Sequence, residues 1–86
     1  MANILSIKEN LAQRARARRR EAKLSQTALA TRSGVSLGSV KRFERSGEIS
    51  LSSLLRIAFA LGFENDFDGL FARRNYQSID EIINEK

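Results

Sequence analysis

Residues 25–44 read SQTALATRSGVSLGSVKRFE, and this stretch decides the fold. It holds two short runs of helix-forming residues, each opened by a serine, with Gly34 and Val35 between them. Ser25 and Ser36 are the predicted N-caps, and Gly34 is predicted to end the first run with a positive φ angle. We therefore expect two short helices joined by a tight turn.

The second of these helices is predicted over 37–45 and has two different faces. Val40 and Phe43 lie three residues apart and are expected to pack inward. A polar face beside a tight two-helix turn is typical of a helix-turn-helix, which places its second helix in a DNA groove. An ordinary helical hairpin fits the same spacing. The residues expected on the outer face are Leu37, Gly38, Lys41 and Arg42.

Charge divides the chain into two parts. Residues 1–62 carry 12 Lys and Arg against 4 Asp and Glu, a net charge of +8, and residues 63–86 carry 3 against 6, a net charge of −3. A basic body indicates a polyanionic partner, and an acidic end indicates a different role. We expect a DNA-binding domain over 1–62 and an extension over 63–86 that dimerises or binds a partner.

The residue types that the chain lacks exclude several kinds of site. It has no Cys and no His, which excludes disulfides, thiolate or imidazole metal ligands and histidine acid–base catalysis. No glycine-rich phosphate loop follows a strand, because no stretch has the period of a strand. We expect no enzymatic activity, no cofactor and no metal. The lack of Cys and of a long apolar run predicts a soluble cytoplasmic protein, associated with the nucleoid through DNA, without a membrane span.

A first helix is predicted over 7–22, because Ser6 and Glu9 form a capping-box pattern. Arginines at positions 14, 16, 18, 19 and 20 crowd its second half. At about 100° per residue they spread around the helix, so some must reach solvent or a phosphate backbone. Its expected apolar stripe contains Ile7, Leu11 and Ala15, with Ala12 and Ala22 beside them.

A fourth helix is predicted over 51–61, between a capping Ser50 and Gly62. A short fifth helix is predicted over 64–71, and residues 78–83 carry a second capping-box pattern on a further short helix. The apolar stripe expected on the fourth helix contains Leu51, Leu54, Leu55, Ala58 and Leu61, with Ile57 beside it.

Large apolar residues on and after the fourth helix exceed what a small body needs to cover itself. We expect them to lie in a dimer interface or to contact a partner, with plain core as the alternative for those of the predicted fifth helix. For the isoleucines at 79, 82 and 83 the sequence does not choose between the same chain, a second copy and a different protein. These residues are Phe59, Phe63, Phe67, Leu70, Phe71, Ile79, Ile82 and Ile83.

Taken together, residues 11–62 resemble the XRE family, the lambda-repressor and Cro type of helix-turn-helix regulator. With Gln26 as the first motif position, Ala30 is fifth, Gly34 ninth and Val40 fifteenth. These are the small residue, the turn glycine and the buried aliphatic of the family. The resemblance implies an all-α, lambda-repressor-like domain of five helices that binds double-stranded DNA sequence-specifically.

The resemblance also implies an ion pair and marks two departures. The family usually pairs an arginine of the first helix with a glutamate that ends the recognition helix, and Arg19 and Glu44 occupy those places. At the position of Leu37 the family often has a glutamine that reads adenine. At the position of Gly38 it often has a side chain that contributes to DNA recognition. Because leucine cannot make that bidentate bond, base reading is expected to shift toward Lys41 and Arg42.

The leading hypothesis is a homodimeric repressor of an inverted-repeat operator, acting on its own promoter. The alternative is an antitoxin that also neutralises a HipA-like kinase toxin, because residues 62–82, GFENDFDGLFARRNYQSIDEI, resemble the C-terminal segment of HipB-type antitoxins. The predicted base-contacting residues are Leu37, Gly38, Lys41 and Arg42. The predicted phosphate-contacting residues are Arg16, Arg20, Lys23, Gln26, Ser39 and Arg45.

Overall fold

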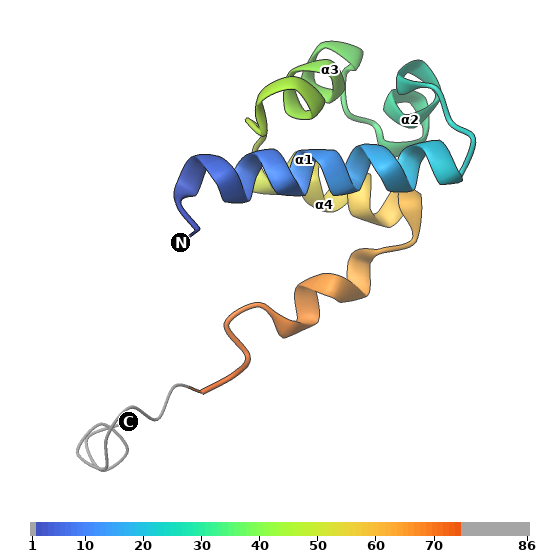
Figure 1. The fold of residues 1–86 in the computed structure, drawn as a ribbon. Coiled ribbons are helices and arrows are strands. Elements are labelled where there is room, and N and C mark those ends of the chain that lie inside the picture. The colour runs from blue at the N-terminus through green and yellow to red at the C-terminus, as the bar shows by residue number, and fades with distance from the viewer. Residues whose placement is uncertain (1, 75–86) are drawn as a thin grey trace, which may run out of the picture.

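The computed structural model describes residues 2–74, which form four α-helices and one 3-10 helix (Figure 1). The prediction of an all-α fold is confirmed, since these residues contain no strand. The predicted helix over 78–83, with Ile79, Ile82 and Ile83, lies outside the described residues. The elements are α1 (Ile4–Glu21), α2 (Gln26–Ser33), α3 (Leu37–Ser46), α4 (Leu51–Leu61) and the 3-10 helix η1 (Glu64–Gly69).

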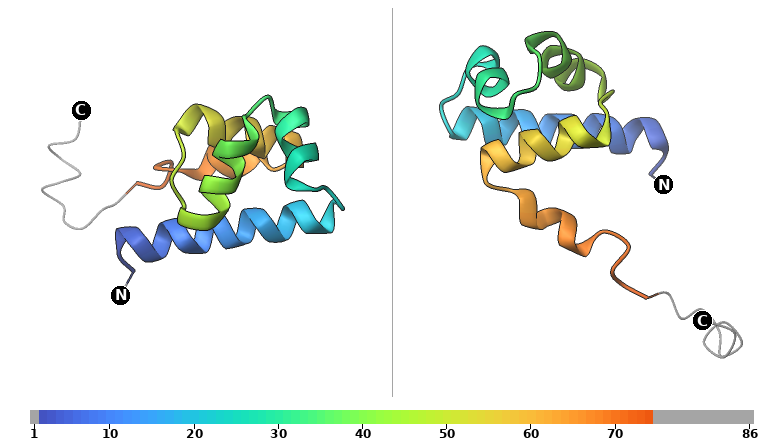
Figure 2. Two further views of the ribbon diagram at one scale, coloured as in Figure 1. Left: turned by 90° about the horizontal axis from the view of Figure 1, so that it is seen from above. Right: turned by 180° about the vertical axis from the view of Figure 1, so that it is seen from behind.

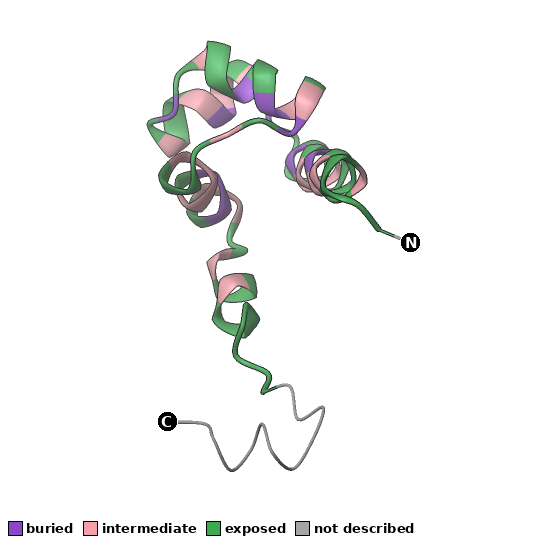
Figure 3. Ribbon diagram, turned by 90° about the vertical axis from the view of Figure 1, so that its left-hand side faces the viewer, coloured by how far each residue is buried: buried purple, intermediate pink, exposed green. Residues whose placement is uncertain are grey.

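The helices surround one small core. α1 packs on α3, and α2 packs on both α3 and α4, so that α2 and α3 lie together on one side of the long α1 (Figures 1 and 2). η1 contacts α4 and leads away from the other helices. The buried core residues come from all four α-helices and from the turns beside α2 (Figure 3): Ala12, Leu24, Leu29, Val35, Val40, Phe43 and Ile57.

Serine caps and glycines define the ends of the short helices. Ser25, Ser36 and Ser50 each accept a hydrogen bond from the backbone N–H three residues on, at 3.0 to 3.1 Å. Gly34 ends α2 and Gly62 ends α4, with φ angles of 76° and 82°. Glycine adopts this left-handed conformation without the steric cost of a Cβ atom. These ends lie where the sequence predicts them.

The start of α1 was predicted wrongly. The helix begins at Ile4, and Asn3 is its N-cap. The Asn3 side chain accepts from the Ser6 N–H at 2.8 Å, while the Ser6 hydroxyl accepts from the Asn3 N–H at 3.0 Å. Ser6 therefore takes part in a capping box one turn earlier than expected. The first turn projects beyond α3 and α4 (Figures 1 and 2), and Ile7, predicted for the apolar stripe, is 54% exposed.

Two predictions about α4 and the segment after it also need correction. Leu51 was expected on the buried stripe but is 65% exposed, because it lies in the first turn of α4, before the helix reaches the core. The helix predicted over 64–71 is the shorter 3-10 helix η1, which buries no residue. A 3-10 helix has a tighter turn than an α-helix, and it is used in short pieces.

Candidate nucleic-acid interface

The face of α3 that points away from the core is polar and mostly basic. Val40 and Phe43 are 0% and 1% exposed, so they fix which side of the helix faces inward. Leu37 is half-buried at the start of the helix. At about 100° per residue, the outer positions follow i, i+3, i+4 and i+7 spacing along one stripe. The exposed residues of this stripe are Gly38, Lys41, Arg42 and Arg45.

Gly38 leaves open space on this stripe. A Cβ atom added there would meet nothing within 4 Å, so the fold does not require glycine at this position. Glycine in a helix is less favourable than alanine by about 0.5–1 kcal/mol. The missing side chain lets another molecule approach the backbone of α3 closely between Lys41 and Arg42.

Arg19 of α1 and Glu44 of α3 form a buried ion pair behind this face. Arg19 Nε donates to Glu44 Oε2 at 2.7 Å, and Arg19 Nη2 donates to Glu44 Oε1 at 2.9 Å. Arg19 Nη1 also donates to the Leu24 carbonyl oxygen at 2.7 Å. The bidentate contact and the extra hydrogen bond satisfy a guanidinium that is withdrawn from water. The pair therefore fixes α3 against α1 and against the turn before α2.

Two predicted phosphate-contacting residues also converge on Glu44. Gln26 Nε2 donates to Glu44 Oε1 at 3.0 Å, and Arg16 Nε lies 3.9 Å from the same oxygen. Burial raises the pKa of Glu44, but hydrogen bonds from Arg19 and Gln26 and the charges of Arg19 and Arg16 outweigh it. The pKa of Glu44 therefore lies below its ordinary value. From the sequence, Gln26 was assigned only to phosphate. The hydrogen bond from Gln26 to Glu44 was missed, because no local sequence pattern predicts it.

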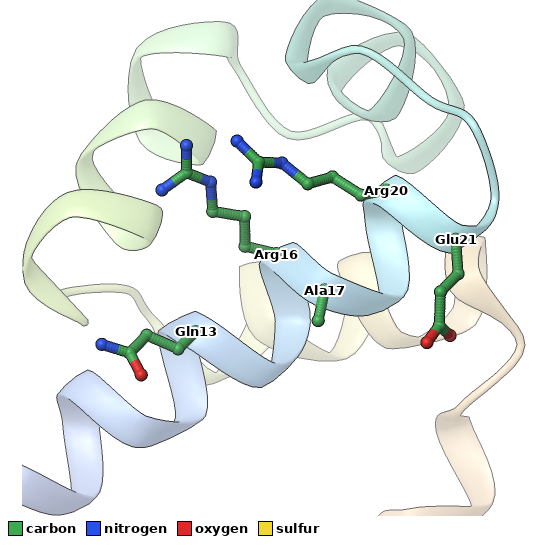
Figure 4. A pocket seen from close by; sticks show the side chains of 5 residues that line it. All are labelled: Gln13, Arg16, Ala17, Arg20 and Glu21. Carbon is green, nitrogen blue, oxygen red and sulfur yellow. The ribbon is translucent and has the colours of Figure 1, made fainter.

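Arg16 and Arg20 extend the basic surface onto α1. They lie one turn apart and point together toward the side of α1 on which α2 and α3 lie (Figure 4). Both are exposed, and they line an open depression with Gln13, Ala17 and Glu21. Lys23 follows α1 and is exposed, with a φ angle of 61° that is unfavourable for a residue with a Cβ atom. Ser39 is exposed near the start of α3, where its hydroxyl pairs with that of Ser36 at 2.9 Å.

Comparison with protein-family models gives a match that covers the helix-turn-helix and the ion pair between Arg19 and Glu44. A model described as Helix-turn-helix matches residues 16–64, more than half of the chain. The chain belongs to the XRE family of helix-turn-helix proteins. A search of curated proteins and a search of solved structures each found no match.

Membership of the XRE family establishes the general function. This XRE protein is a DNA-binding transcription regulator with a lambda-repressor-like all-α domain. None of the helices described within residues 2–74 is long and apolar enough to cross a membrane. In the same residues, no three acidic side chains gather in a way that could hold a metal ion.

Proposed function

We propose that the protein is a homodimeric, sequence-specific repressor of transcription. The observation that supports this most strongly is the exposed stripe of α3, with Lys41 and Arg42 on either side of the open Gly38. In the proposed complex, α3 lies in the major groove. The two cationic side chains donate to guanine O6 and N7. Leu37 and Gly38 contact base edges without side-chain hydrogen bonds, because neither has a polar side-chain group.

Phosphate contacts hold α3 in register with the bases. We assign them to exposed or half-buried polar residues around the stripe, and these side chains come from three helices and the turn after α1. Such contacts orient the protein and supply affinity for every sequence, without reading bases. The residues are Arg16, Arg20, Lys23, Gln26, Ser39 and Arg45.

A dimer of such domains requires an operator of matching symmetry. Residues 1–62 bind DNA in this proposal, and residues 63–86 join the two copies. Two recognition helices then enter successive major grooves on one side of the duplex, about 34 Å apart, and the operator is an inverted repeat. Binding at a promoter, including its own, excludes the polymerase. The protein acts by binding alone, without catalysis.

The experiment is a titration of promoter DNA with wild-type protein and two variants at several salt concentrations. Arg42→Ala is expected to cost about 1–3 kcal/mol and to relax specificity at one base position. Lys23→Ala is expected to weaken binding to all sequences alike and to reduce the salt slope. Affinity that does not change between low and moderate salt contradicts the proposed phosphate contacts.

A second candidate function is that of an antitoxin that also neutralises a kinase-like toxin. The observation behind it is the exposed, acidic segment after α4, in which Leu70 and Phe71 are 60% and 103% exposed. The test is co-expression with the product of a neighbouring kinase-like gene, followed by purification through a tag on either protein. A stable complex that forms with the full chain and is lost when residues 63–86 are removed, with helix content by circular dichroism retained, supports this function. Separate elution of the two proteins argues against it.

A further inference from the structure

The segment after α4 leaves apolar side chains uncovered in a single copy. We call residues 63–71 the arm. Leu70 and Phe71 of the arm are 60% and 103% exposed, and Phe63 is 40% exposed. The arm contacts α4 and leads away from α1, α2 and α3 (Figures 1 and 2). It carries three acidic residues and no basic one, at positions 64, 66 and 68. A surface that binds the arm therefore has to be both apolar and basic.

One flank of α1 has this character. We call it the α1 flank, and its residues follow one another at i+3 or i+4 spacing. Ile4 and Ile7 are 78% and 54% exposed, and Arg14 is exposed and makes no ion pair within residues 2–74. The flank is apolar toward the start of α1, where Leu11 also packs partly against the core. Toward its end the available positive charge is that of Arg14, because the half-buried Arg18 donates to Glu21 at 2.8 Å. Its residues are Ile4, Ile7, Leu11, Arg14 and Arg18.

The α1 flank faces away from the proposed DNA contacts. At about 100° per residue, Arg14 and Arg18 lie roughly 160° around the helix from Arg16 and Arg20. Arg16 and Arg20 point toward the side on which α2 and α3 lie (Figure 4). A molecule bound to the α1 flank therefore leaves the DNA-binding face open.

We propose that the arm of a second copy binds the α1 flank, and that each copy gives its arm to the other. This inference rests on the dimer of the proposed function and names its surface. The arm lies antiparallel to α1, so that Leu70 and Phe71 cover Ile4 and Ile7. Asp66 then lies beside Arg14. This direction places the two most exposed apolar residues of the arm on the exposed isoleucines of the α1 flank.

The lengths of the two segments also match. Seven residues of α-helix separate Ile7 from Arg14, which corresponds to about 10 Å. From Asp66 the chain advances about 6 Å within η1, which ends at Gly69, and at most about 7 Å over the two further residues to Phe71, so the two lengths are comparable. Reciprocal exchange of arms gives a two-fold interface, which closes at two copies and covers both sets of exposed apolar residues.

Disulfide cross-linking tests the contact, because the protein has no Cys of its own. Ile7→Cys and Leu70→Cys variants with tags of different size are mixed and oxidised. We expect a disulfide-linked heterodimer that forms at least tenfold faster than with the matched pair Arg20→Cys and Leu70→Cys. All these positions are exposed, so circular dichroism should show unchanged folding. Equal rates overturn the proposal, as does an Ile7→Cys/Leu70→Cys double variant that closes its disulfide within one chain.

Charge reversal tests the pairing of Asp66 with Arg14. Arg14→Asp and Asp66→Arg are each expected to lower the dimer association constant about tenfold, because like charges then face each other twice in the homodimer. Mixing the two variants places opposite charges together in both contacts, so the mixture is expected to recover wild-type dimerisation by analytical ultracentrifugation. A mixture that dimerises no better than its components overturns the proposal.

The same variants separate this inference from the proposed function. A titration with promoter DNA is carried out alongside each ultracentrifugation measurement. A wild-type dimer that does not bind promoter DNA contradicts the proposed function and leaves the cross-linking result valid. A wild-type dimer that binds DNA but does not cross-link between positions 7 and 70 overturns only the proposed surface.

Discussion

Arg19 and Glu44 join α1 to α3 through two hydrogen bonds of 2.7 and 2.9 Å, and their side chains are only 8% and 5% exposed. Removing one member of a buried ion pair leaves the other charged and without its partner, which costs about 3–5 kcal/mol. We expect Arg19→Ala to lower the free energy of unfolding by this amount. Urea unfolding followed by circular dichroism measures it.

Arg32→Ala is the matched control for this prediction, because it removes an exposed arginine from the last turn of α2. Surface substitutions of this kind usually change stability by less than about 0.5 kcal/mol. Equal changes in the free energy of unfolding would show that the buried ion pair contributes no more to stability than an exposed arginine does. Arg19→Lys should fall between them, because lysine keeps the charge but loses the bidentate geometry.

Acid should weaken the fold through Glu44. Its pKa is lowered in the folded protein, so its contribution to stability is complete above the unfolded pKa of about 4.3 and is lost as pH falls through the folded pKa. The difference in free energy of unfolding between wild type and Glu44→Gln should therefore shrink below about pH 4. Urea unfolding at a series of pH values measures it. A difference that grows toward acid contradicts the assignment, and Glu9→Gln, which removes an exposed carboxylate, is the control.

The helix-turn-helix itself could be predicted from the sequence because its determinants are local. Capping serines at 25 and 36 and the glycine at 34 set helix ends within a few residues of chain. The three-residue spacing of Val40 and Phe43 identified the buried side of α3, and both are buried. The exposure of Phe59, at 68%, also follows from its position outside the α4 stripe.

Contacts between distant segments could not be predicted in this way. The hydrogen bond between Gln26 and Glu44 joins side chains 18 positions apart, for which the sequence gives no local sign. The close approach of Gly47 to α1 is of the same kind, although a glycine after α3 is itself an ordinary helix-end signal.

Gly47 should tolerate alanine poorly, for two reasons that can be separated. Its φ angle is 77°, and an added Cβ would lie 2.7 to 2.8 Å from the Cβ, carbonyl carbon and carbonyl oxygen of Lys8. Gly62 has a φ angle of 82° but open space around it. We expect Gly62→Ala to cost about 1–2 kcal/mol from the backbone alone. Gly47→Ala should cost about 1–3 kcal/mol more, because α1 must shift. Thermal unfolding of both variants checks this, and equal losses contradict the contact with Lys8.

Gly38→Ala should change stability and DNA binding in opposite directions. The added methyl group meets no protein atom within 4 Å, and alanine favours the helix by about 0.5–1 kcal/mol. The melting temperature should therefore rise. If a base edge approaches the backbone at this position, affinity for the operator should fall on the order of tenfold, the size of one lost base contact. Higher stability with unchanged affinity would remove position 38 from the interface.

Lys23→Gly should also separate stability from binding, and Lys23→Ala is its matched control. Lys23 has a φ angle of 61°, a conformation that costs a residue with a Cβ atom about 1–2 kcal/mol. Glycine removes that strain at some cost in unfolded-state entropy, so we expect a gain of about 1 kcal/mol. Alanine keeps the strain and should leave stability nearly unchanged.

Both variants lose the same charge, so both should weaken binding to every DNA sequence and reduce the salt slope by about 1. Thermal unfolding and DNA titrations at several salt concentrations measure the two effects. A salt slope that stays at the wild-type value in both variants would show that Lys23 makes no phosphate contact.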